Sequence, residues 1–197
     1  MLGAGQSLET LTAAEGSAAI NLTGNALGQS IYGNAGANVL TSGGGADYMV
    51  GGAGSDTFFL TNAPGVATIG DYAAGEVVNI TQYLSVANGT NVTTGGFVRI
   101  TAAGELQVDA NGGGDAYVTI ANVPGSTAVT LRYLAGGVAT NVNVSRSASQ
   151  DAVVSKMAID DGPTHAPALD GWHAGSALHD TPGLDPIAPH FEMHGII

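Results

Sequence analysis

Residues 24–59 of the 197-residue chain read GNALGQSIY, GNAGANVLT, SGGGADYMV and GGAGSDTFF when they are divided into four consecutive nonapeptides. Each unit is rich in glycine in its first half. Its eighth position is a large apolar residue, which is Ile31, Leu40, Met49 and Phe58 in turn. A flexible glycine-rich linker, the alternative explanation of this composition, does not repeat an apolar residue with such a period.

The repeat predicts an all-β fold that begins with a short parallel β-roll. Each unit is expected to form a glycine turn and a very short strand, and two units make one coil. Strands 18 residues apart then stack about 4.8 Å from each other. Ile31 is therefore expected against Met49 on one face, and Leu40 against Phe58 on the other. Leu22, nine residues before Ile31, extends this register backward.

The sixth positions of the units supply side-chain oxygen atoms at the ends of the turns. Gln29 is expected to face Asp47 on one edge of the roll, and Asn38 to face Asp56 on the other. Together with backbone carbonyls of the stacked turns, these side chains make an all-oxygen cage that suits a hard cation such as Ca²⁺. Glycine allows the turn backbone to adopt positive φ and to come close to the ion. The predicted metal-binding glycines are Gly33, Gly36, Gly43, Gly45, Gly52 and Gly54.

The last nonapeptide matches the pattern G-G-x-G-x-D-x-U-x, where U is a large apolar residue, at every fixed position. The third unit departs only at Ser42, and the first two carry Gln29 and Asn38 in place of the aspartate. The stretch thus resembles the RTX repeats of bacterial proteins exported by type I secretion, such as serralysin-type proteases, lipases, adhesins and S-layer proteins. The resemblance implies a right-handed β-roll, calcium as the cofactor and a type I exporter as a partner.

The chain is acidic and contains few basic residues. Sixteen Asp and Glu residues face four Lys and Arg, for a net charge of −12, and there is no cysteine. So few basic residues disfavour nucleic acid as a partner, whereas the excess of carboxylates fits a cation binder. The absence of cysteine rules out disulfides and thiolate sites. The N-terminus lacks the features of a Sec-type signal peptide, and no apolar stretch is long enough to predict a transmembrane segment.

The sequence divides into four predicted regions. Residues 1–23 form a lead-in with cap strands, 24–59 the roll, 60–144 a β-rich cap and 145–197 a disordered tail with a possible secretion signal. A first residue directly ahead of a half-formed coil suggests a fragment of a longer protein.

Two further strands are expected directly after the repeats, over 68–72 and 77–81. The stretch IGDYAAGEVVNI that contains them is similar to the D-F-x-x-G-x-D-x-I segment that follows RTX repeats, with Val77 in place of the second acid. Asp71 is either a cation ligand at the end of the roll or a solvated turn residue.

Beyond residue 86, glycine-rich punctuation separates runs of alternating apolar residues, which predicts an antiparallel β-region. The expected strands are 97–101, 105–109, 117–121, 128–133 and 138–144. The expected core residues are Phe97, Leu106, Val108, Val118, Ile120, Val129, Leu131, Tyr133 and Leu134.

The loop DANGGGD at 109–115 resembles the start of an EF-hand, which would make Asp109 and Asp115 weak cation ligands. Its twelfth position is Ile120 in place of the required acid. A glycine-rich hairpin turn is the favoured alternative.

The tail contains all five histidines and five of the seven prolines without apolar periodicity, which indicates disorder. A short helix over 152–159 and the apolar end at 191–197 are the expected elements of exporter recognition. The histidines lack the spacing of a metal-binding helix, so an unstructured tail is favoured over a metal site.

The sequence contains no G-x-S-x-G elbow, Walker A loop or zinc-protease helix. We therefore expect no enzymatic activity and no small-molecule substrate. The expected function is that of a calcium-binding C-terminal module of a type I secreted protein, which folds on Ca²⁺ outside the cell, or at its surface, and supports export. The alternatives are a structural or adhesive surface protein and a fragment of a secreted hydrolase whose catalytic domain lies upstream.

Overall fold

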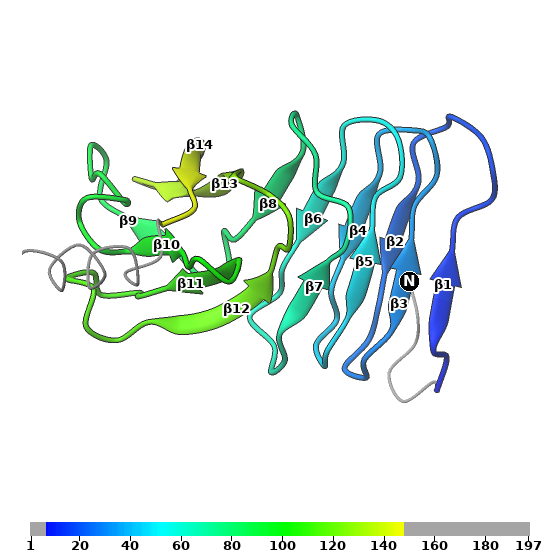
Figure 1. The fold of residues 1–197 in the computed structure, drawn as a ribbon, viewed down its shortest axis with the longest axis horizontal. Coiled ribbons are helices and arrows are strands. Elements are labelled where there is room, and N and C mark those ends of the chain that lie inside the picture. Colours follow the sequence, from blue (N-terminus) through cyan, green and yellow to red (C-terminus); the bar gives the residue numbers. More distant parts are fainter. Residues whose placement is uncertain (1–6, 148–197) are drawn as a thin grey trace, which may run out of the picture. The chain divides into compact units, whose positions relative to one another are not determined.

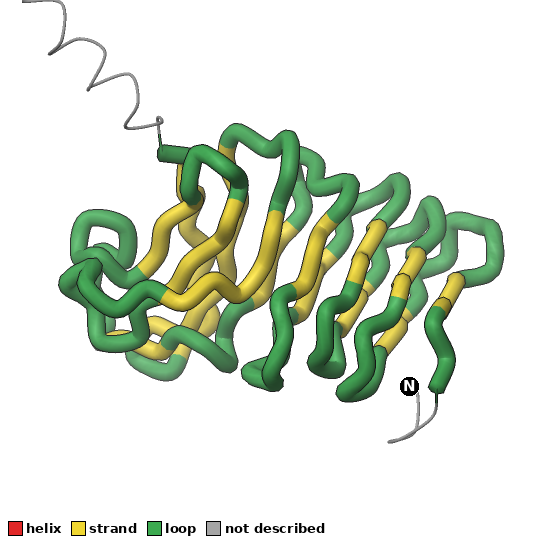
Figure 2. Tube along the Cα trace, turned by 60° about the horizontal axis from the view of Figure 1, so that its bottom comes forward, coloured by secondary structure: helices red, strands yellow, loops and turns green. Residues whose placement is uncertain are grey.

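The computed structural model describes residues 7–147. All regular secondary structure in this part consists of β-strands, as Figures 1 and 2 show. None of its segments is a helix long and apolar enough to cross a membrane. The expected helix at 152–159, the histidines and the apolar end at 191–197 lie outside the described residues.

Eight short strands form the roll: β1 (Thr10–Thr12), β2 (Asn21–Thr23), β3 (Ser30–Tyr32), β4 (Val39–Thr41), β5 (Tyr48–Val50), β6 (Thr57–Phe59), β7 (Ala67–Ile69) and β8 (Val77–Asn79). The odd-numbered strands pair in parallel in one sheet and the even-numbered strands in the other. Two strands and two turns therefore make one coil, and four coils are stacked side by side (Figure 1).

The four coils do not share one period. In the nonapeptide region the paired residues are 18 positions apart, as for Ile31 and Met49. At either end they are 20 apart, as for Leu11 and Ile31 or for Phe58 and Val78. The roll thus extends in both directions beyond the predicted 24–59, because coils that are longer by two residues still deliver each strand in register.

The core of the roll consists of two apolar ladders, one on each sheet. Ile31, Met49 and Ile69 stack along the first. Leu40, Phe58 and Val78 stack along the second, and Leu22 continues it at the N-terminal side. Apart from Leu22, which is half-buried, all of these side chains are fully buried. The predicted register of the eighth positions is confirmed.

Six further strands form the cap: β9 (Ser85–Val86), β10 (Val98–Ile100), β11 (Glu105–Val108), β12 (Val118–Asn122), β13 (Ala128–Ala135) and β14 (Val138–Ser145). β10, β11 and β12 pair antiparallel, as do β13 and β14. β12 then pairs in parallel with β7, and β13 with β8. The cap therefore continues both sheets of the roll, and one apolar cluster runs through both parts.

Most predicted core residues of the cap are buried, but the prediction is wrong for Val118, whose side chain is 63% exposed. Val118 begins β12 and borders an open groove with Pro64, Val66 and Tyr83, so solvent reaches it. Phe97 and Leu134 are partly buried.

Candidate cation sites

The turns of the roll lie in two rows, one along each edge. The first row contains the turns 24–29 and 42–47 and the loop 60–66. The second row contains the turns 33–38, 51–56 and 70–76. Within each row, a turn lies beside the corresponding turns of the preceding and following coils. The sixth residue of each nonapeptide closes its turn and precedes a strand.

Asp47 and Asp56 use one carboxylate oxygen each to hold the turn of the preceding coil. The backbone N–H of Gln29 donates to Oδ1 of Asp47 at 2.8 Å, and that of Asn38 donates to Oδ1 of Asp56 at 2.7 Å. Both side chains are 1% exposed, and Oδ2 of each is buried without a hydrogen-bond donor. A buried carboxylate oxygen without a partner carries a large desolvation cost, which a bound cation offsets.

Burial raises the pKa of Asp47, although the backbone N–H groups of Gln29, Gly43 and Gly44 act in the opposite direction. This shift means that the folded protein disfavours the bare charge at Asp47. A cation beside the carboxylate would reverse the effect.

The amide of Asn38 does not offer its oxygen to a cage with Asp56, which differs from the sequence prediction. Oδ1 of Asn38 accepts from the backbone N–H of Ile20 at 3.0 Å. Nδ2 donates to the carbonyl oxygens of Gly36 (2.6 Å), Asn34 (3.2 Å) and, on the next coil, Gly51 (3.4 Å). The oxygen of Asn38 thus holds the preceding turn as an aspartate would, while the NH₂ group satisfies carbonyls that would otherwise face a cation.

Gln29 also departs from the predicted pairing with Asp47. Its longer side chain folds back on its own turn, where Oε1 accepts from the backbone N–H of Asn25 and Nε2 donates to the Asn25 side chain at 2.7 Å. Both amide-bearing turns are therefore closed by hydrogen bonds, whereas the aspartate-bearing turns retain a buried acceptor.

Glycine is needed in these turns for two separate reasons. Gly52 and Gly54 have φ of 90° and 115°, which residues with a side chain rarely adopt. Gly33 and Gly43 have ordinary φ values, but a Cβ atom on either would collide with the backbone of the neighbouring turn, at Gly51 and Asn25 respectively. Gly45 also has a positive φ, and a Cβ atom on Gly36 would also collide with the backbone of the preceding coil.

Asp71 lies in the second row, but both of its oxygens are occupied. Oδ1 accepts from the backbone N–H of Gly51 at 2.9 Å and Oδ2 from that of Gly52 at 2.8 Å. Asp71 therefore anchors the backbone of the last nonapeptide turn, and its charge lies close to the site.

Glu76 is the residue that the sequence reasoning missed. It is 1% exposed, Oε2 accepts from the backbone N–H of Ala73 at 2.6 Å, and Oε1 is buried without a donor. The segment 70–76 is one residue longer than a nonapeptide turn, so its acid falls outside the frame. The available signal was an acid directly before an apolar strand, 20 residues after Asp56.

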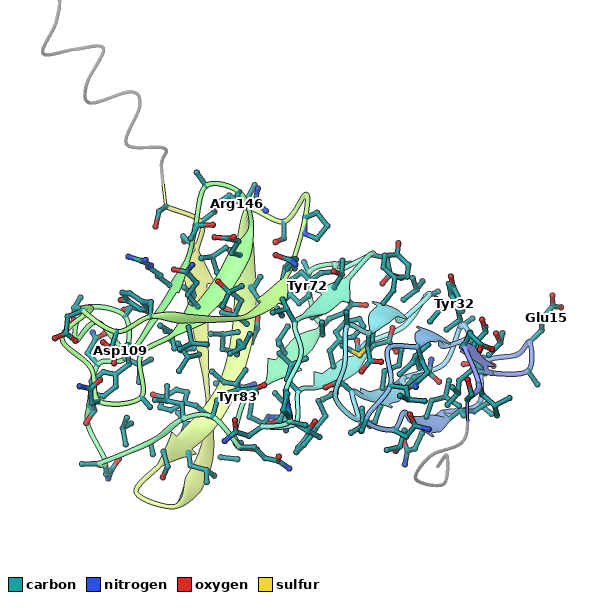
Figure 3. The ribbon with its side chains drawn as sticks, turned by 90° about the horizontal axis from the view of Figure 1, so that it is seen from below. Glu15, Tyr32, Tyr72, Tyr83, Asp109 and Arg146 are labelled. Carbon is teal, nitrogen blue, oxygen red and sulfur yellow. The ribbon has the colours of Figure 1, made fainter. Side chains whose placement is uncertain are left out.

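Asp109 and Asp115 lie in the cap and do not form a cage. Asp109 is fully buried, and its carboxylate accepts backbone N–H groups from Asn111, Gly114, Asp115 and Ala116 at 3.1–3.3 Å. Burial opposes its ionisation, but these four donors outweigh burial and lower the pKa of Asp109. The Asp109 carboxylate therefore closes a hairpin turn between β11 and β12. Asp109 and Glu15 lie toward opposite ends of the described part of the chain (Figure 3).

Within residues 7–147, no three His, Cys, Asp or Glu side chains are grouped so that they could hold a metal ion by themselves. A cation in the roll must therefore be bound mainly by backbone carbonyls with one or two carboxylates. This is the ligand set that glycine turns with a terminal acid provide, and oxygen-only sites of this kind suit Ca²⁺.

Residues 23–58 match the family model of the RTX calcium-binding nonapeptide repeat, in four copies. Neither a search of curated proteins nor a search of solved structures finds a match to the chain. The matched residues coincide with the two coils whose turns hold Asp47 and Asp56. This part of the chain is therefore a calcium-binding RTX repeat block, folded as the two central coils of the β-roll.

Proposed function

We propose that the chain is the calcium-binding C-terminal module of a type I secreted protein, which folds on Ca²⁺ outside the cell and supports export. The observation that carries the proposal is the pair of buried oxygens, Oδ2 of Asp47 and Oδ2 of Asp56, that lack a donor within RTX turns. These two carboxylates, with carbonyls of their turns, would hold the ions. The calcium would supply the positive charge that these buried groups otherwise lack.

The charge of the chain supports coupling between folding and calcium. With a net charge of −12, compaction brings carboxylates together and is opposed by their repulsion. Calcium sites of extracellular modules bind at roughly 10⁻⁴–10⁻³ M. At low cytosolic calcium such sites remain unfilled, so the stabilisation by ligand binding appears only outside the cell.

The proposal includes the absence of catalysis in this chain. RTX-repeat proteins are typically secreted, and in such proteins an activity would reside in another part of the polypeptide. Asp47, Asp56 and Asp71 accept hydrogen bonds from backbone N–H groups of the neighbouring turns. The described residues include no histidine that could serve as a base for a nucleophile beside them.

Calcium dependence is tested by circular dichroism of the full chain. We expect a weak β signal with chelator and a strong one in millimolar Ca²⁺, with little effect of equimolar Mg²⁺, which prefers a smaller octahedral site. The double variant Asp47→Ala/Asp56→Ala should lose the response. Asp115→Ala, which removes an exposed acid from the cap, should keep it. Identical wild-type spectra with chelator and with calcium would disprove the calcium-dependent folding.

Export is tested separately in cells that contain a type I exporter able to secrete the full chain. We expect a chain truncated after Arg146 to retain its calcium response and to remain in the cell. Secretion of the truncated chain would place the signal within the β-region and contradict this part of the proposal.

A further inference from the structure

The stacking of the second row places Glu76 over Asp56 in the same way as Asp56 lies over Asn38. The backbone N–H of Thr57 donates to the carbonyl of Asn38 at 2.9 Å, and that of Val77 donates to the carbonyl of Asp56 at 3.0 Å. Each of these strands begins with a bond to the residue that closes the turn of the previous coil. Glu76 is therefore the structural counterpart of Asp56 on the last coil of the roll.

The two gaps between these three turns are filled differently. The gap between turns 33–38 and 51–56 contains the amide NH₂ of Asn38, which donates to three carbonyls. The next gap lies between turns 51–56 and 70–76, which are closed by Asp56 and Glu76, and the charge of the Asp56 carboxylate acts on Glu76. Oδ2 of Asp56 and Oε1 of Glu76 are both buried, and neither has a donor.

The surroundings of this gap add further negative charge. Burial, together with the carboxylates of Asp71 and Asp56, raises the pKa of Glu76 to about 7, although the backbone N–H of Ala73 acts in the opposite direction. The side chains of Arg99, Arg132 and Arg146, the basic residues in the described part, donate hydrogen bonds to residues of the cap. Two buried acceptors in a negative field need a cation or a shared proton between them.

We propose that Glu76 is a calcium ligand and that it forms, with Asp56, a cation site between turns 51–56 and 70–76. The site lies partly outside residues 23–58, where the nonapeptide repeats are matched. It rests on the proposed calcium-dependent function and extends it to a coil that carries no nonapeptide. Asp71 positions the Gly51 and Gly52 backbone of this site and is not itself a ligand.

The site is linked directly to the cap. The hydroxyl of Tyr72 donates to the carbonyl of Glu76 at 3.0 Å and accepts from the backbone N–H of Thr130, in β13, at 2.7 Å. Figure 3 shows Tyr72 near the middle of the described part, where the last coil meets the cap. An ion on Glu76 would therefore stabilise the junction of the roll with the cap in addition to the roll itself.

The test is calcium titration calorimetry on the full chain, with thermal unfolding of the same samples. Glu76→Gln should bind one fewer calcium ion per chain than the wild type. It should remain folded, because the new amide can donate to Asp56 as that of Asn38 donates to its neighbours. Glu15→Gln, an exposed change in the loop between β1 and β2 of the same edge, should leave the number of ions unchanged.

If Glu76→Gln does not fold, Glu76→Asp decides the question. The Glu76→Asp variant keeps the negative charge but shortens the side chain by one methylene, which moves the carboxylate away from the ion. We therefore expect one calcium ion to bind at least about tenfold more weakly, as is typical when a group that supports a metal site is lost. Wild-type binding by either folded variant overturns the inference and leaves the proposed function standing. Absence of calcium binding by the wild type overturns both.

Discussion

The backbone N–H of Asn38 donates to Oδ1 of Asp56, 18 residues further along the chain, at 2.7 Å. Asn38 and Asp56, which close the turns 33–38 and 51–56, each fasten the segment of the preceding coil with one oxygen, and the second polar atom of each side chain determines what occupies the gap. In Asn38 that atom is a donor, which satisfies carbonyls. In Asp56 it is an acceptor without a partner. A turn that ends in an amide is therefore closed by its own hydrogen bonds, whereas a turn that ends in a carboxylate needs a cation.

Replacing the amide by a carboxylate should convert a closed turn into a calcium site. We expect Asn38→Asp to bind one more calcium ion than the wild type. In chelator it should be less stable by about 1–3 kcal/mol, because three carbonyls lose a donor and a second carboxylate faces Asp56. Calorimetry and chemical unfolding, each with and without calcium, measure both effects. Asn88→Asp, an exposed change in the cap, is the matched control. An unchanged number of ions in Asn38→Asp would contradict the role assigned to the amide.

The two repeat aspartates should differ in importance. Asp56 faces a second carboxylate, Glu76, across its gap, whereas the loop 60–66 that follows Asp47 in the first row contains no acid. Asp56→Ala should therefore weaken calcium binding more than Asp47→Ala, by about tenfold or more. Titration calorimetry of the two single variants gives the order directly. Stronger loss from Asp47→Ala would show that the first row holds the better site.

The apolar ladder should matter independently of calcium. Phe58 is fully buried between Leu40 and Val78, so Phe58→Ala leaves a cavity and should cost about 3–5 kcal/mol. Urea unfolding in saturating calcium measures this loss. Tyr48→Ala on the outer face, where the ring is 42% exposed, should cost much less. Equal losses would mean that the inner ladder does not carry the stability of the roll.

The carboxylate of Asp109 should stabilise the cap in a pH-dependent manner. Because its pKa is lowered in the folded state, its contribution is present above the unfolded-state value of 3.8 and disappears as the pH falls through the folded-state pKa. Asp109→Asn should thus melt at a lower temperature than the wild type at neutral pH, and the difference should shrink below about pH 4. Scanning calorimetry across this range tests the expectation. Asp115→Asn, at an exposed position of the same loop, should show no such difference; a gap that persists in acid would exclude the carboxylate as its cause.

The nonapeptide period was sufficient to predict the two central coils. A residue at every ninth position specifies which side chain faces inward, so the stacking of Ile31 on Met49 and of Leu40 on Phe58 followed from spacing alone. The outer coils are longer by two residues and carry no repeated motif, so their continuation of the roll was not visible as a period. Hydrophobic alternation located β10 to β14 of the cap but not the two-residue strand β9. It also could not show that β12 and β13 join the sheets of the roll.

The candidate ligands were predicted less completely than the fold. An asparagine offers an oxygen and a nitrogen, and only the surrounding groups decide which one faces the gap. Three carbonyls around Nδ2 of Asn38 settle that choice in the folded chain. Glu76 escaped prediction because one extra residue in each of the segments 60–66 and 70–76 displaced it by two positions from the frame in which an acid was sought.

The strands of the roll are only three residues long, whereas β13 and β14 pair over eight residues each. Tension applied at residue 7 would act first on β1, whose partner in its sheet is β3, and then on β2, whose partner is β4. Each step would break the few backbone bonds of one short strand, with the bound ions as local reinforcement. The roll would thus yield to a pull in small successive steps from its N-terminal coil, and the long hairpin of the cap would resist last.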